Sequence, residues 1–119
     1  MAQREKVDIN MYQGDRAKYK FSLFTDDAKT LPYNISSATS VVMSVANTLD
    51  SSAVLFSKTI VDGTDGSSFS TGVLYFFFTN AQTALLNRNG KYDIQINFGS
   101  NPETACYGDV IVQRQVTPT

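Results

Sequence analysis

The chain has 119 residues, with ten lysines and arginines, eleven acidic residues and a net charge of −1. A chain of this length predicts a single domain (residues 1–119) that buries roughly two-thirds of the surface its unfolded form exposes. The basic residues are scattered, which argues against nucleic-acid binding, and no apolar run approaches the roughly 20 residues of a membrane-spanning helix. We therefore expect neither a nucleic-acid nor a membrane partner.

Seven segments of the chain predict β-strands, most of them because apolar and polar side chains alternate with a period of two. The predicted strands are residues 6–12, 17–25, 39–46, 53–61, 73–79, 91–98 and 106–116. Glycine, asparagine, aspartate and serine dominate the connections between them, as is typical of turns.

In the first four predicted strands the apolar side chains fall on one side. They are Val7, Ile9, Met11, Tyr19, Phe21, Leu23, Val41, Met43, Val45, Val54, Phe56 and Ile60. Lys58 interrupts the apolar side of the fourth strand, so we expect its ammonium group to reach the rim. Residues 1–5 and 115–119 lie outside the pattern, and we expect them to form short arms of the domain.

A short helical turn is predicted between the fifth and sixth strands. Thr79 suits an N-cap, and Gln82, three residues later, completes a capping box. Gly90 suits the left-handed position at the end of this helix. In the last strand, Gly108 predicts a bulge or a close backbone contact. The sixth strand alternates cleanly, with inward Tyr92, Ile94, Ile96 and Phe98.

Seven short strands at a spacing of about ten residues, without a βαβ rhythm, predict an all-β fold. The expected architecture is an immunoglobulin-like antiparallel β-sandwich with one short helical turn.

The motifs follow an order that resembles a known family. They are a Gly-Asp turn after the opening strand, a proline-led connection, a Phe-Thr turn, a Gly-x-Tyr strand and a closing Gly-x-Val segment. They occupy residues 9–15, 32–38, 78–86, 90–96 and 108–117. In this order they resemble the small immunoglobulin-like domain found at the N-terminus of phage baseplate upper proteins and in many short phage structural proteins.

The resemblance implies a structural protein of a bacteriophage virion, made in the host cytoplasm and assembled with other virion proteins into symmetric oligomers. It implies no catalytic residues. We expect a place in the tail, as a baseplate component or a fibre adaptor. A capsid decoration protein would share the fold and the chemistry and stays open as an alternative.

The residue types argue independently against catalysis. Because the chain has no histidine, it lacks the commonest general base near neutral pH and the usual partner of a nucleophilic serine or cysteine. Its acidic residues fall mostly in turns or on outward strand positions. We therefore expect no enzymatic activity, no catalytic residue and no cofactor.

Two other features of the sequence bear on possible chemistry. The acidic loop 62–66 lacks the spacing and the distant glutamate of an EF-hand, so we expect a turn there and assign no metal ligand. Cys106 has no histidine or CxxC partner, and we expect it in or near the core.

The fifth strand is apolar on both faces. Its two sets are Val73, Tyr75 and Phe77 on one face and Leu74, Phe76 and Phe78 on the other. A sandwich strand usually has one face in water, so one set needs a cover. Leu85 and Leu86 of the capped turn could supply part of it. As a hypothesis, we assign Leu74, Phe76 and Phe78 to a protein–protein interface.

A carbohydrate-binding or adhesin domain is the alternative from a different functional class. Tyr12, Tyr33 and Tyr107 could offer stacking surfaces for sugar rings, whereas the absence of tryptophan argues against this function.

Overall fold

The computed structural model describes residues 5–25, 28–47, 54–86 and 88–113. Its strands are β1 (Glu5–Lys6), β2 (Ile9–Tyr12), β3 (Ala17–Ser22), β4 (Ser40–Asn47), β5 (Val54–Ile60), β6 (Val73–Phe78), β7 (Gly90–Phe98) and β8 (Asn101–Gln113). Its helices are the 3-10 turns η1 (Thr64–Gly66) and η2 (Phe69–Thr71) and the four-residue α1 (Asn80–Thr83). Of the two expected arms, all but Glu5 lies outside the described residues. Within the described ranges, no helix combines the length and apolar character that crossing a membrane requires.

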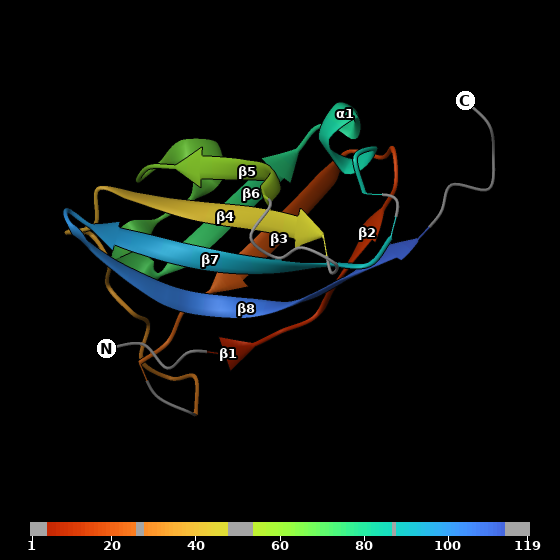
Figure 1. The fold of residues 1–119 in the computed structure, drawn as a ribbon. Helices are drawn as coiled ribbons and strands as arrows, with labels where there is room; N and C mark the ends of the chain where they lie inside the picture. Colours follow the sequence, from red (N-terminus) through yellow and green to blue (C-terminus); the bar gives the residue numbers. More distant parts are fainter. Residues whose placement is uncertain (1–4, 26–27, 48–53, 87, 114–119) are drawn as a thin grey trace.

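The strands form two sheets that face each other (Figure 1). The large sheet has the order β1-β8-β7-β4-β5, with β2 also on β8, and the small sheet pairs β3 with β6. Counting β1 and β2 as one opening strand, the second and fifth strands form the small sheet, and the first, third, fourth, sixth and seventh form the large sheet. The opening strand pairs with β8 in parallel, which departs from the predicted antiparallel arrangement, whereas the other pairings are antiparallel. The separation of the second and fifth strands from the third, sixth and seventh is that of immunoglobulin domains. The predicted all-β immunoglobulin-like sandwich is therefore confirmed.

Three strands depart from the predicted bounds by more than one residue, and one of them is β3, which ends at Ser22 instead of residue 25. The opening strand is interrupted at Val7 and Asp8, and β8 begins well before its predicted start, so that Pro102 lies inside it. In the described residues β1 joins β8 only from Cys106 onward. The beginning of β8 is therefore a sheet edge, where proline's missing N–H group costs no ladder hydrogen bond.

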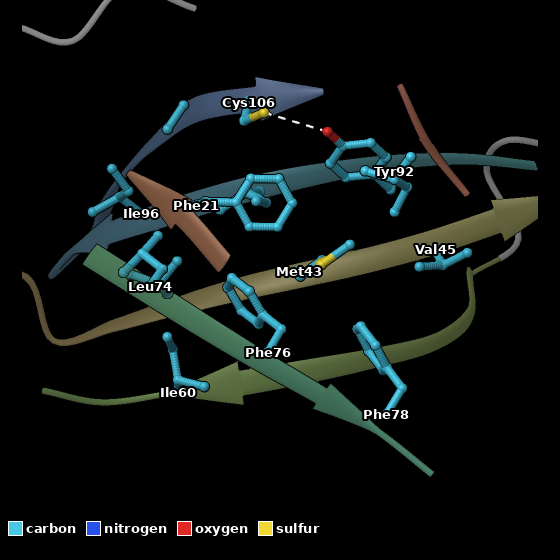
Figure 2. Packing of buried hydrophobic residues seen from close by; sticks show 14 of the residues in the cluster. Phe21, Met43, Val45, Ile60, Leu74, Phe76, Phe78, Tyr92, Ile96 and Cys106 are labelled. Carbon is cyan, nitrogen blue, oxygen red and sulfur yellow. Dashed lines mark hydrogen bonds between the residues drawn. The ribbon is translucent and has the colours of Figure 1, made fainter. Parts of the chain in front are cut away.

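Large aliphatic and aromatic side chains fill the space between the sheets (Figure 2). The inward positions of β4 and β7 supply Val41, Met43, Val45, Tyr92, Ile94 and Ile96. Phe21 meets Phe76 with ring centroids 6.0 Å apart, and Phe56 meets Phe78 at 5.2 Å, both edge-on. Each such pair contributes about 0.5–1.5 kcal/mol beyond the burial of its area. Cys106 is buried in the same core, as predicted.

The inward face of β6 is the face that the sequence hypothesis assigned to a partner. Leu74, Phe76 and Phe78 are only 0%, 0% and 2% exposed, so their assignment to a protein–protein interface is wrong. The pairing of β6 with β3 explains their position. Lys18 lies directly opposite Phe77, and directly opposite residues share a face of the sheet. Because the lysine stays in water, Phe77 points outward and its neighbours point into the core.

The helix α1 begins as predicted. The Thr79 hydroxyl accepts the Gln82 amide, and the Gln82 side chain accepts the Thr79 amide, which completes the capping box. The buried Thr83 hydroxyl donates to the Asp15 carbonyl at 2.7 Å and accepts the Gly14 amide at 3.1 Å. These contacts tie α1 to the turn after β2.

Two of the glycines that lie where backbones approach closely are the ones that the sequence marked as special. Gly90 opens β7 and lacks the left-handed conformation predicted for it; a β-carbon there would collide with the Ala46 carbonyl. A β-carbon on Gly108 would collide with the Val7 carbonyl, which confirms the predicted close contact. The sequence identified both positions as special, but the reason at Gly90 is steric and not conformational.

The opening segment of the chain is held against β8 around Gly108. The Val7 amide donates to the Tyr107 carbonyl at 2.8 Å, and the Asp8 carboxylate accepts an amide of β8 at 2.9 Å. From the core, the Tyr92 hydroxyl donates to the Val7 carbonyl. The break between β1 and β2 is therefore bridged by hydrogen bonds to backbone and side chains.

Replacing Phe76 by alanine is expected to lower the free energy of unfolding by about 3–5 kcal/mol, because the change leaves a cavity between the sheets. Phe77→Ala, one residue away on the outward face, is expected to lower it by less than about 1 kcal/mol. Urea denaturation followed by circular dichroism measures both losses. Equal losses would contradict the orientation of β6 described above.

Gly108→Ala is expected to push the opening segment away from β8 and to destabilise the protein by about 1–3 kcal/mol, as overpacking does. Amide hydrogen exchange should accelerate at Val7, whose amide bonds to β8, while the amides shared by β4 and β7 keep their protection. Unchanged exchange at Val7 would show that the opening segment does not depend on this close contact.

Candidate functional site

The outer face of the small sheet carries the aromatic side chains that the core leaves out. Tyr75 and Phe77 on β6 lie opposite Lys20 and Lys18 on β3. The Lys18 ammonium lies 5.1 Å from the ring centre of Tyr75 and 5.3 Å from that of Phe77. The Lys20 ammonium lies 6.0 Å from the ring centre of Tyr75. We call these four residues the aromatic–lysine face.

This face combines apolar area with positive charge. Phe77 is 39% exposed even though a lysine lies over its ring. Exposed cation–π contacts contribute about 0.5–1 kcal/mol each, and lysine stems cover part of the rings. Among the described residues, neither Lys18 nor Lys20 takes part in an ion pair. The face therefore suits contact with a surface that is partly apolar and carries carboxylates.

A second candidate site is a hollow of about 630 Å³ on the outer face of the large sheet. Ser44 of β4, Asp93 of β7, Tyr107 of β8 and Lys6 of β1 line it and are successive neighbours across the strands. Residues directly opposite one another share a face of the sheet, so these four side chains belong to one surface. We call this site the large-sheet hollow.

The charged groups of the hollow differ in their partners. The Lys91 ammonium lies 3.5 Å from the Asp109 carboxylate, an exposed pair of the kind that contributes about 0–1 kcal/mol. Asp93 is half-buried, with Ser44 and Tyr107 beside it on the neighbouring strands. Its carboxylate forms no hydrogen bond or ion pair within the described part of the chain. Burial raises the pKa of Asp93 above its usual value, because the charged form is poorly solvated there.

The three tyrosines considered as stacking surfaces do not gather at one place. Only Tyr107 lines the large-sheet hollow. Tyr12, which is 58% exposed, lies at the end of β2. Tyr33 donates to the Glu103 carboxylate at 3.0 Å, and burial together with that hydrogen bond raises the pKa of Tyr33. The three tyrosines therefore do not form one stacking surface, and only Tyr107 lies at a hollow that could hold a ligand.

The acidic loop considered for calcium is a hydrogen-bonded turn. The Asp62 carboxylate accepts the Phe69 amide at 3.0 Å, and the Thr64 hydroxyl accepts the Val61 amide at 3.1 Å. In the described ranges, no three acidic or cysteine side chains lie close enough together to form a metal site.

In the sequence, Ser44, Asp93 and Lys6 look like ordinary outward strand positions, so they carry no sign of a shared site. These side chains lie together because of the register in which four strands pair. The local sequence pattern of each strand does not determine that register.

No protein-family model matches the chain, and no curated protein matches it. Among solved structures, the crystal structure of the Group B Streptococcus pullulanase SAP is similar over 77% of this chain, with 14% sequence identity and a TM-score of 0.48. The similar region covers 10% of that protein. A likeness of this degree carries no information about function.

Asp93→Asn is expected to raise the melting temperature at pH 7 relative to the wild type. The raised pKa means that the folded state holds this proton more tightly, so the charged carboxylate disfavours folding at every pH above the folded pKa. The difference between the variants should shrink as the pH falls below that pKa and vanish below the unfolded value of about 3.9. The groups facing Asp93, namely Lys6, Lys91, Tyr107 and Asp109, are common to both proteins.

Thermal unfolding of both proteins between pH 3 and pH 7 measures this difference. A difference in melting temperature that does not depend on pH would contradict the proposed desolvation of Asp93. So would a wild type that is more stable than Asp93→Asn at pH 7.

Proposed function

We propose that this domain is a non-catalytic structural protein that acts by binding neighbouring proteins in an assembly, and that the assembly is a bacteriophage particle. The aromatic–lysine face is the observation that carries the contact. The sequence resemblance to small phage structural domains supports the virion setting. It favours the tail, as a baseplate component or fibre adaptor, with capsid decoration as the alternative.

The composition of the aromatic–lysine face supports a protein partner. Interface centres are enriched in tyrosine and phenylalanine, and the few residues that dominate affinity lie in desolvated pockets. Two rings held by a paired strand lose little conformational freedom on binding. A typical interface buries about 800 Å² per partner, so Tyr75 and Phe77 form its centre and not its full extent.

The charges of the face favour a different protein over a second copy. In a two-fold symmetric dimer built on this face, the same patch of both subunits would meet. Lys18 and Lys20 would then face the same two lysines of the partner, which costs energy through like-charge repulsion. We therefore propose a partner protein with carboxylates around an apolar pocket, and we assign the oligomeric contacts expected in a virion to other surfaces.

Particles carrying the double variant Tyr75→Ser and Phe77→Ser test this function. The coding sequence is changed in its genome of origin, and purified particles are analysed by quantitative mass spectrometry. We expect the wild-type protein to be present in the particles and the double variant to be reduced at least about tenfold, a change of roughly 1.4 kcal/mol in binding. Cross-linking of the wild-type particles should join Lys18 or Lys20 to the partner.

Ile111→Ser is the matched control, because Ile111 has the same exposed fraction as Phe77, 39%, but lies on the large sheet. It should be incorporated normally, and all variants should keep the wild-type circular dichroism spectrum. Absence of the wild-type protein from particles would refute the virion function. Normal incorporation of the double variant would refute only the assignment of the aromatic–lysine face.

A further inference from the structure

We propose that the large-sheet hollow is a binding site for a neutral saccharide. This inference does not depend on the virion function, because it rests on a different sheet and on different residues. Its volume of about 630 Å³ lies within the range of roughly 300–1,000 Å³ that is typical of small-molecule sites.

The charge balance of the hollow selects the class of ligand. Lys6 and Lys91 contribute two positive charges, and Asp93 and Asp109 contribute two negative charges, so the four formal charges cancel. An anionic ligand would meet the carboxylates, and a cationic ligand would meet the ammonium groups. A neutral ring rich in hydroxyl groups can donate to the carboxylates and accept from the ammonium groups at the same time.

The Asp93 carboxylate is a hydrogen-bond acceptor in the hollow to which no described residue donates. Asp93 itself is half-buried. Two neighbouring hydroxyl groups of a sugar match the two oxygens of a carboxylate, and hydrogen bonds to a charged acceptor are stronger than neutral ones. The carboxylate is only partly buried, so a ligand in the hollow can reach it.

Tyr107 and Ser44 complete the site on either side of Asp93. Tyr107 is 39% exposed, so part of its ring is open to a ligand, and such rings present an apolar body beside a polar hydroxyl. Ser44 adds a hydroxyl that can both donate and accept. The three residues lie on β4, β7 and β8, each paired on both sides, so the site is held on rigid elements before any ligand arrives.

A titration followed by amide chemical shifts tests the proposal. The 15N-labelled domain is titrated to millimolar concentrations with mono- and trisaccharides of glucose, galactose, mannose and N-acetylglucosamine. We expect at least one of these probes to shift the amides of Ser44, Asp93 and Tyr107. Asp93→Asn and Tyr107→Ala should each weaken that binding at least about tenfold.

Tyr12→Ala is the matched control, because Tyr12 is an exposed tyrosine outside the hollow, and it should leave the affinity unchanged. Amide spectra of the free variants establish that each one is folded. No shift with any probe, or equal affinity of the wild type and Tyr107→Ala, would overturn the proposal. A response confined to sialyllactose or to a lysine tripeptide, added as charged probes, would overturn the choice of a neutral ligand.

Discussion

The contact on which the structure depends is the insertion of the inward side chains of β6 into the space above the large sheet. The small sheet has two strands, so it has few residues with which to hold its layer in place. Leu74, Phe76 and Phe78 are buried almost completely, and full burial of such side chains contributes about 1.5–3 kcal/mol each. The same contact orients the strand, since placing Phe76 inward leaves Phe77 outside. The aromatic–lysine face is therefore a direct consequence of how the core is filled.

The features that could be predicted from the sequence are those with local causes. The period of two located the strands, and the spacing of Thr79 and Gln82 predicted a capping box that the structure contains. The residues of β6 alone could not predict which of its two faces points into the core, because the side chains on both faces are apolar. The orientation of β6 is decided by its partner strand β3. Lys18 of β3 must stay in water, and Phe77, directly opposite it, therefore points to the same outer face. Pairing the second strand with the fifth before choosing a face would have given the correct orientation.

The large-sheet hollow lay beyond sequence reasoning for a different physical reason. Its residues come from four strands, and their meeting depends on register, which a slip of one residue would invert. The pairing of β7 with β8 contains such an irregularity, because the register shifts between Ile94 and Gln95. On one side of this shift Asp93 lies opposite Tyr107, and on the other Gln95 lies opposite Thr104. If the register seen at Gln95 continued without this shift, a residue other than Tyr107 would lie opposite Asp93. Ser44, Asp93, Tyr107 and Lys6 would then no longer be successive neighbours across the four strands.

The two candidate sites lie on opposite sides of the core, because each belongs to the outer face of its own sheet. Packed sheets are about 10 Å apart, and Phe77 and Asp93 point away from each other across that distance. Substitutions at such separated positions usually have independent effects on stability, so we expect the two sites to respond independently to substitution. A subunit anchored through the aromatic–lysine face would present the hollow away from its anchor, where a saccharide can reach it.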